Sequence, residues 1–467
     1  MTEHFGAIVV GAGPAGQKAA ICMAKAGRRV LLVDRTVRVG GACVRHGTVP
    51  SKTLREVAVT FDKLRRLTGR DIGSPLAEQT PLASLMARKD AVIDAHEGYM
   101  HAQLARNGVE LRRAIASFED KRTVELLDVH GGRTRVSADR YFLATGSSPK
   151  DPDDVCVDHQ HILDSDSILS LTYLPRSLVV LGSGVIACEY ASIFSALGVP
   201  VTMVHSYPSP LGFLDPDLVS CFLDGLSARG GTYLGNVRID HAAWNGLYGV
   251  DVNLSDGNVL SADKVLCALG RSANVHGLGL ERAGVKLSDR GHVRVDRYFR
   301  TSTPHIYAVG DVVGPPSLAS TSMEQGRRAA QHALGVPVEH EISAVPTSIF
   351  TIPEISSVGL TEAQALEAHG VVRTGHANFA EVARGQISDN VSGHLKLVAD
   401  SAGRLIGAQI AGEGASELVH VAQMAILGGL HVDTFVDEAM SFPTLAEAFR
   451  IAALDMLQSR ELARAAE

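Results

Sequence analysis

The sequence predicts an α/β protein in which two similar units precede a C-terminal α+β domain. Two glycine-rich turns carry this prediction: Gly11–Gly16 (GAGPAG) follows the apolar run Ala7–Val10, and Gly182–Ala187 (GSGVIA) follows Leu178–Leu181. An apolar strand, a glycine turn and a helix in this order form the phosphate-binding part of a dinucleotide fold. We therefore expect two Rossmann-like dinucleotide-binding domains. Two dinucleotides in one protein usually exchange electrons.

Composition limits the class of protein. A chain of 467 residues is too long for one hydrophobic core. Its net charge of −7 argues against nucleic-acid binding, which needs a basic surface. No apolar run approaches the ~18 residues that span a bilayer. The six cysteines form no CxxC pair and no metal-ligand spacing, and no signal peptide is recognisable. We expect a soluble cytoplasmic protein with no metal site.

The first unit begins with a strand, turn, helix and strand over residues 5–34. Pro14 suits the first helical turn because its missing N–H would have no partner there. Val30–Val33 is predicted to be a buried strand that ends at Asp34. Further along, the pattern predicts helices at Ser51–Leu67 and Leu85–Asn107, short strands at Arg122–Leu127 and Thr134–Ala138, and a closing segment at Tyr141–Gly146.

The second unit repeats this order. A strand to Leu181, a glycine turn, a helix through Leu197 and a strand at Val201–Val204 are followed by Lys264–Gly270, the counterpart of the first closing segment. From Ser343 the pattern changes to strands (Ser348–Ile352, His394–Val398, Leu405–Ile410) mixed with helices (Glu417–Leu427, Leu445–Leu457), without a nucleotide turn.

In the first nucleotide site, the glycines allow a tight turn and close approach of a pyrophosphate to the helix N-terminus. Asp34 lies 23 residues after Gly11, where a carboxylate can accept both ribose hydroxyls.

In the second site the corresponding strand ends in His205-Ser206, and no carboxylate is present. A 2′-phosphate is then tolerated, but no arginine stands nearby to bind it. His205 and Ser206 either donate hydrogen bonds to that phosphate or form an ordinary surface turn. The preference between NAD and NADP stays open.

Three further segments resemble a known family. Gly40–Lys52 resembles the redox segment of the two-dinucleotide flavoprotein disulfide reductases, the dihydrolipoamide dehydrogenase-like family; Ile306–Asp311 resembles their second FAD motif, and Pro443–Glu447 their C-terminal signature. The likeness runs from Phe5 to about Met456. It implies an FAD domain (1–150), an inserted NAD(P) domain (151–274), a return to the FAD domain (275–342) and a dimerisation domain (343–467).

Two departures from this family affect the chemistry. The second redox cysteine is replaced by Thr48, and the histidine base before Pro443 is replaced by Phe442. A dithiol relay needs two sulfurs, and a thiolate needs a base to take its proton. Glu447 keeps the orienting position but has no imidazole to orient. With both residues replaced and Cys43 kept, the chain resembles the soluble pyridine nucleotide transhydrogenases. Four further segments resemble the same subfamily: Asp164–Leu169, Cys188–Phe194, Pro353–Gly359 and Phe442–Phe449.

The resemblance implies that Lys52 lies by flavin N5, paired with Glu189, where a cation favours hydride acceptance. The alternative is a buried ion pair that only fixes the arrangement of two domains. Cys43 would rest against the flavin as a redox relic, a sulfenic-acid former or a packing residue, and packing is favoured.

Other roles follow from the same resemblance. Asp311 would bind the ribitol, Leu318-Ala319 would start a helix whose amides face flavin O2, and the segments near Thr145 and Ile115 would line the adenosine end. Arg271 would sit at a seam between domains or be a plain surface cation. Lys52 and Glu189 are the predicted catalytic residues, and both are also expected to contact a cofactor. The other predicted cofactor-binding residues are Gly11, Gly13, Pro14, Ala15, Gly16, Asp34, Arg35, Gly41, Ala42, Cys43, Thr48, Ile115, Ala144, Thr145, Gly146, Gly182, Gly184, Val185, Ile186, His205, Ser206, Gly270, Arg271, Gly310, Asp311, Leu318 and Ala319.

These observations predict an FAD-dependent oxidoreductase that transfers hydride between NADPH and NAD⁺ by a ping-pong mechanism, as a homodimer or larger homo-oligomer. One alternative is an NAD(P)H-dependent flavoprotein reductase or dehydrogenase acting on a quinone or specialised metabolite, with Phe442 in an apolar pocket. Another is a non-catalytic redox-sensing flavoprotein.

Overall fold

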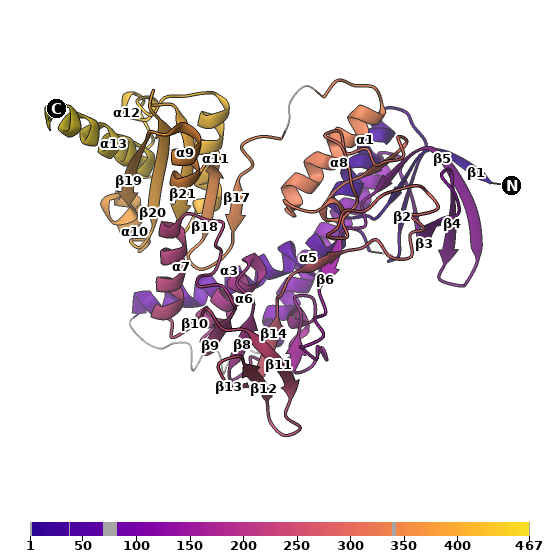
Figure 1. Ribbon diagram of the computed structural model, residues 1–467, viewed down its shortest axis with the longest axis horizontal. Coiled ribbons are helices and arrows are strands. Elements are labelled where there is room, and N and C mark those ends of the chain that lie inside the picture. Colours follow the sequence, from indigo (N-terminus) through magenta and orange to yellow (C-terminus); the bar gives the residue numbers. More distant parts are fainter. Residues whose placement is uncertain (1, 37, 69–81, 339–341, 467) are drawn as a thin grey trace. The chain divides into compact units, whose positions relative to one another are not determined.

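The computed structural model describes residues 2–36, 38–68, 82–338 and 342–466 (Figure 1). The chain divides into two compact units. Unit 1 contains Met1–Thr53, Ala83–Lys150 and Gly270–Ile342, and unit 2 contains Leu54–Leu82, Asp151–Leu269 and Ser343–Glu467. The four domain ranges predicted from the sequence stay a prediction.

Unit 1 is built on a six-stranded sheet. Strands β1 (Glu3–Val10), β2 (Val30–Asp34), β5 (Arg133–Leu143) and β16 (Ile306–Ala308) run parallel, and β2 also pairs in parallel with the first half of β3 (Glu110–Phe118). The strand β4 (Thr123–Asp128) pairs antiparallel with both β3 and β5. A two-stranded ribbon of β6 (Ser147–Pro149) and β15 (Arg271–Ala273) completes the described strands of this unit.

The core of unit 1 lies on both faces of this sheet because successive strand residues point to opposite sides. Ala7 and Val9 belong to one buried cluster, with residues of α1 (Pro14–Lys25) and α8 (Ala319–Ala333). Ile8 and Val10 belong to the other, with residues of β3, β4 and β5. Helices α1 and α8 pack side by side (Figure 1).

Unit 2 contains two large sheets. A parallel sheet has the order β10 (Thr232–Leu234), β9 (Val201–Val204), β8 (Leu178–Leu181), β14 (Lys264–Cys267), β7 (Ile162–Leu163). Helices α6 (Val185–Ala196) and α7 (Pro216–Ala228) follow β8 and β9, and β11 (Ile239–Trp244), β12 (Val250–Leu254) and β13 (Val259–Ala262) form a small antiparallel sheet.

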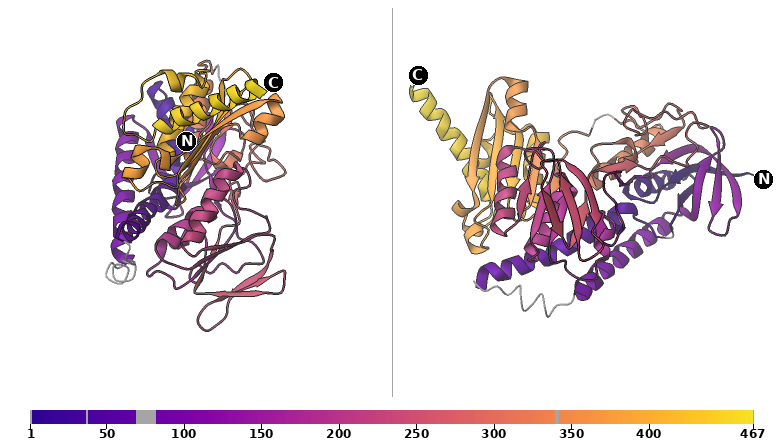
Figure 2. Two further views of the ribbon diagram at one scale, coloured as in Figure 1. Left: turned by 90° about the vertical axis from the view of Figure 1, so that its left-hand side faces the viewer. Right: turned by 60° about the horizontal axis from the view of Figure 1, so that its bottom comes forward.

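The C-terminal sheet of unit 2 is antiparallel, in the order β17 (Thr347–Ile349), β18 (Ile355–Gly359), β21 (Leu405–Ala411), β20 (His394–Asp400), β19 (Val372–Asn378). Helix α13 (Glu447–Ala466) packs on β19 and β20, as Figure 2 shows for the yellow helix, while α11 (Ala415–Leu427) packs on β18 and β21. Helix α9 is Glu362–His369. The predicted fold class, two parallel dinucleotide-type sheets and a C-terminal α+β part, is confirmed.

Most predicted elements appear within a few residues of their expected bounds, including α3 (Thr48–Thr68) and α5 (Leu82–Arg106). One prediction was wrong: Thr134–Ala138 and Tyr141–Gly146 are not separate segments. They belong largely to the single strand β5, whose first half pairs with β4 and whose second half pairs with β1. Polar Asp139 and Arg140 interrupt the apolar pattern in the sequence but do not end the strand. The backbone stays extended through them because β5 is paired with β4 before these residues and with β1 after them. Within the described residues, no helix is both long enough and apolar enough to cross a bilayer.

Candidate dinucleotide sites

The first glycine turn has the geometry of a phosphate cradle. Gly11 has a φ of +106°, and a Cβ there would lie 2.2 Å from the Ala144 carbonyl oxygen. A Cβ on Gly16 would lie 1.9 Å from the Gly11 carbonyl oxygen, so the turn and the helix pack too tightly for any side chain. Gly13 is the N-cap of α1 and makes no side-chain cap hydrogen bond. The first amides of α1 are therefore left for an anionic group.

Asp34 is fixed at the end of β2, beside this turn. Its Oδ2 accepts a hydrogen bond from the Ala12 amide at 2.8 Å, and its Oδ1 accepts from the Thr36 amide and hydroxyl at 2.9 Å. Asp34 pairs in register with Arg113 on β3, and Ile115 lies two residues further along that strand. The structure thus brings Asp34, Ile115 and the glycine turn to one end of the sheet, with Ile115 55% exposed. Arg35 is exposed next to Asp34.

Cys43 and Thr48 lie together where α2 (Gly41–Arg45) gives way to α3. The Thr48 hydroxyl hydrogen-bonds the free Cys43 thiol. Burial raises the pKa of Cys43. The Thr48 hydrogen bond and the Lys52 ammonium lower this pKa, and the Asp311 carboxylate raises it. The net effect is a raised pKa, so Cys43 is a protonated thiol rather than a reactive thiolate.

Asp311 is held by a hydrogen-bonded chain within unit 1. The Ser147 hydroxyl donates to Asp311 Oδ2 at 2.8 Å, and Arg271 Nε donates to the Ser147 oxygen at 2.8 Å. A second Arg271 nitrogen donates to the Ser147 carbonyl at 2.8 Å. Arg271 therefore has hydrogen-bonded partners next to Asp311, and both sequence interpretations of this arginine stay predictions.

The segment Ala144–Gly146 is joined to the return segment through Asn274. The Thr145 hydroxyl donates to the Asn274 carbonyl at 2.7 Å, and the Asn274 side-chain amide donates to the Thr145 carbonyl at 2.9 Å. Sequence reasoning missed Ser147 and Asn274. The sequence marks these two residues only by their position, because each lies within three residues of a predicted site residue.

Helix α8 begins as the resemblance implied. Leu318 is its N-cap, Ala319 its first residue, and Leu318 makes no side-chain cap hydrogen bond. The preceding Gly310, whose φ is +80°, donates its amide to Gln325 on this helix at 2.7 Å. Gln325 therefore fixes the Gly310-Asp311 turn against α8, a role that the sequence did not reveal.

The second glycine turn repeats the first. Gly182 has a φ of +131°, and a Cβ there would lie 2.5 Å from the Ala268 carbonyl oxygen. Gly184 is the N-cap of α6 with no side-chain cap hydrogen bond, and a Cβ there would meet open space. Val185 and Ile186 open this helix. Gly182 has no room for a side chain, whereas the space next to Gly184 is open. This arrangement fits a pyrophosphate bound over the helix N-terminus.

His205 lies at the end of β9, at the edge where a ribose would sit. Its Nδ1 accepts a hydrogen bond from the Tyr207 amide at 3.1 Å, which places the proton of the neutral ring on Nε2. Burial lowers the pKa of His205 below its ordinary value. The neighbouring Ser206 is exposed.

The two predicted catalytic residues occur in different units. Glu189 is buried on α6 in unit 2, where its Oε1 accepts a hydrogen bond from the Phe350 amide at 2.9 Å. Lys52 is in unit 1, at the start of α3, and its Nζ donates to the Ser51 hydroxyl at 3.4 Å. Their pairing across the flavin stays a prediction.

Three comparisons bear on these sites. Residues 5–326 match the family described as pyridine nucleotide-disulphide oxidoreductase, and residues 345–453 match its dimerisation domain. A soluble pyridine nucleotide transhydrogenase from Mycobacterium bovis is 39% identical over 97% of each chain, and one from Hahella chejuensis is 39% identical over 98% of this chain and 99% of that relative. The crystal structure of LpdA from Mycobacterium tuberculosis superposes with a TM-score of 0.88 at 30% identity, over 96% of this chain and 99% of the other.

Proposed function

Because the chain belongs to the pyridine nucleotide-disulphide oxidoreductase family, we propose that it transfers hydride between NADPH and NAD⁺ through FAD. The family uses FAD and NAD(P)H, so the predictions of these cofactors and of an FAD-dependent oxidoreductase are confirmed. The finer proposal concerns the electron acceptor, which we take to be a second nicotinamide rather than a disulfide.

The observation that carries this proposal is the Cys43–Thr48 pair. Thr48 occupies the position of a second sulfur and hydrogen-bonds the only cysteine of this segment. A hydroxyl cannot close a disulfide, and a thiol with a raised pKa is a poor nucleophile. Phe442 offers no proton acceptor in the position before Pro443. Dithiol chemistry is thereby disfavoured, and full-length relatives named as transhydrogenases support the alternative.

The residues of the first site fit FAD. The amides at the start of α1 would hold its pyrophosphate, Asp34 its adenosine ribose, and Asp311 its ribitol hydroxyls. Bound FAD would supply a two-electron carrier that accepts and returns hydride. The amides at the start of α8 would stabilise negative charge at the pyrimidine edge of the ring.

Lys52 and Glu189 would stabilise developing negative charge rather than transfer protons. An ammonium near the reacting nitrogen stabilises negative charge that develops there, and the buried carboxylate of Glu189 would orient it. Hydride transfer needs no acid or base, only close approach of the two rings in a site without water. One glycine turn serves the nicotinamide nucleotides, so donor and acceptor would take turns, which predicts ping-pong kinetics.

The test is direct. Purified flavin-loaded protein would be mixed with NADPH and thio-NAD⁺, with no other acceptor present. Sustained turnover with parallel lines in initial-rate plots supports the proposal. Bleaching of the flavin that stalls after one equivalent of NADPH, or rapid reduction of a disulfide substrate, contradicts it.

A second candidate is an NAD(P)H-dependent reductase of a quinone or specialised metabolite. Phe442 favours it, because this aromatic side chain is 74% exposed in the position of the family's base. Turnover that resumes only when a quinone is added would support this candidate. If NADPH does not bleach the flavin at all, a redox-sensing role is the better proposal.

We propose a homodimer built on the dimerisation domain. Helix α11 turns Ala422 and Ala425 toward the sheet, while Met424 and Leu427 on its outer face are 58% and 53% exposed. An exposed apolar stripe of this kind is typical of a surface buried by a second chain. All six cysteines are free, which supports the cytoplasm as the compartment.

A further inference from the structure

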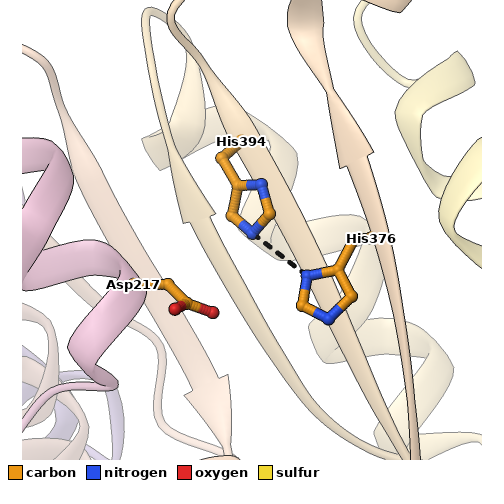
Figure 3. A group of neighbouring side chains, drawn as sticks. All are labelled: Asp217, His376 and His394. Atoms are coloured by element: carbon orange, nitrogen blue, oxygen red, sulfur yellow. Dashed lines mark hydrogen bonds between the residues drawn. The ribbon is translucent and has the colours of Figure 1, made fainter.

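Asp217, His376 and His394 bring three metal-ligating side chains together in unit 2. One ligand atom from each lies within 4.8 Å of the other two (Figure 3). Asp217 lies in the first turn of α7, and the histidines lie on the adjacent strands β19 and β20. The register pairs His376 with Lys396 and Asn378 with His394, so the two imidazoles share one face of the sheet, diagonally opposed.

The spacing of the two imidazoles matches a coordination sphere. His376 Nδ1 and His394 Nε2 are 3.4 Å apart. Two nitrogens that each lie about 2.0–2.1 Å from zinc at a tetrahedral angle are separated by about 3.4 Å. From this geometry we propose that Asp217, His376 and His394 form a binding site for a borderline divalent transition metal, with Zn²⁺ as its representative. Binding requires the ring that donates this hydrogen bond to carry its proton on its other nitrogen, so that both facing nitrogens can coordinate the metal.

The surrounding charges favour a cation. Lys396 Nζ contacts Asp215 Oδ1 at 3.1 Å, Asp217 Oδ2 at 3.0 Å and Glu362 Oε2 at 2.7 Å. One ammonium therefore faces three carboxylates, and the cluster keeps a negative excess. Lys396 contacts Oδ2 of Asp217 and so orients this carboxylate, whose Oδ1 would be the ligand atom. Such outer partners fix the direction of a ligand.

The site has room for further ligands. Asp217, His376 and His394 line a surface cavity of about 590 Å³, whose wall also includes Cys221 and Glu381. Three protein ligands beside open space leave coordination positions for water or a small anion. Two nitrogens and one oxygen favour Zn²⁺, Ni²⁺ or Cu²⁺ over Mg²⁺, which prefers oxygen ligands. This chemistry is separate from the hydride transfer proposed above.

No metal site is expected from the sequence, and the proposed cluster has no local signal in it. The two histidines are 18 residues apart, on strands joined by a long connection, and Asp217 comes from a distant helix. No local spacing signals the cluster, so only the tertiary structure reveals it.

The test measures metal binding to the intact flavin-loaded protein. After chelator treatment and desalting, isothermal titration with Zn²⁺ should show one site per chain in a non-coordinating buffer, and Mg²⁺ should show none. The double variant His376→Gln/His394→Gln should bind Zn²⁺ at least about 100-fold more weakly. His420→Gln, which changes an exposed histidine on α11, should bind as the wild type does.

The flavin spectrum and the melting temperature without metal verify that each variant is folded. If the double variant does not fold, His376→Gln alone replaces it, with at least about a 10-fold loss expected. Co²⁺ should give visible d–d absorption in the wild type that disappears in the histidine variant. Absence of a one-equivalent site in the wild type at about 100 µM Zn²⁺, or undiminished binding by a folded histidine variant, would overturn the proposal. Transhydrogenase activity plays no part in either outcome.

Discussion

The Ser147 hydroxyl donates a hydrogen bond to Asp311 Oδ2 at 2.8 Å and at the same time accepts one from Arg271 Nε at 2.8 Å. Ser147 follows the closing strand of the first half of unit 1, whereas Asp311 and Arg271 belong to its return segment. A single hydroxyl therefore connects the predicted ribitol carboxylate to the predicted seam arginine. This contact joins the first part of unit 1 to its return segment, and it would hold the predicted ribitol site in shape.

The first prediction concerns this contact. Ser147→Ala leaves Asp311 without its donor and Arg271 without one acceptor, and a hydrogen bond to a charged group contributes about 1.5–3 kcal/mol. We expect FAD to bind roughly 10- to 100-fold more weakly, measured by titration of the apoprotein with FAD. Ser137→Ala, on the exposed side of the same sheet, is the control. Equal FAD affinity in both variants would show that Ser147 has no part in cofactor binding.

The second prediction concerns the state of Cys43. The Thr48 hydroxyl and the Lys52 ammonium favour the thiolate against the effect of burial. Thr48→Val should therefore raise the pKa of Cys43 further and shift the pH profile of its alkylation to higher pH. Mass spectrometry of the Cys43 peptide after iodoacetamide treatment follows this site separately from the other five cysteines. Thr48→Ser should keep the wild-type profile; an unchanged profile in Thr48→Val would contradict the hydrogen bond.

The third prediction concerns pH and the second nucleotide site. Burial lowers the pKa of His205, so the ring is neutral at pH 7 and gains its charge only below its ordinary titration range. If His205 contacts the 2′-phosphate, the Kd for NADPH should fall as the pH drops from 7 toward 5, more than the Kd for NADH does. His205→Gln should remove this difference. Parallel pH profiles for NADPH and NADH in the wild type would identify His205 and Ser206 as an ordinary surface turn.

The fourth prediction concerns the contact between α1 and α8. A Cβ on Gly326 would lie 2.1 Å from the Ala15 carbonyl oxygen, so Gly326→Ala must push backbone against backbone. Overpacking of this kind costs about 1–3 kcal/mol, and we expect a lower apparent melting temperature and weaker flavin retention. Gly98→Ala is the matched control, because Gly98 lies within α5 with nothing within 4 Å of its Cβ position. Alanine should stabilise that helix by up to about 1 kcal/mol.

The fifth prediction concerns oligomeric state. Met424→Asp combined with Leu427→Asp places two carboxylates on the exposed face of α11 and should shift the protein from dimer to monomer. Size-exclusion chromatography with light scattering measures the mass. Val259→Asp, at an exposed apolar position on β13, should leave the dimer intact. A dimer that survives the double substitution would move the interface elsewhere.

The sequence by itself determined the two glycine turns, their strands and helices, and the loss of a second sulfur at Thr48. These features are local: glycine at a positive φ, a strand before it and a helix after it lie within about 25 residues, so their physical requirements appear in the printed order. The same holds for Leu318-Ala319 at the start of α8.

Only the tertiary structure decided what distant residues do to one another. Strand β5 is continuous because its two halves pair with different strands, which no single segment of sequence encodes. The contacts Ser147–Asp311, Thr145–Asn274 and Gly310–Gln325 join segments that are 15 to 164 residues apart. The cluster of Asp217, His376 and His394 depends on the register of β19 with β20 and on the docking of α7. Hydrogen bonds and metal coordination act over a few ångströms in space, and the separation of residues along the chain does not reveal which of them meet.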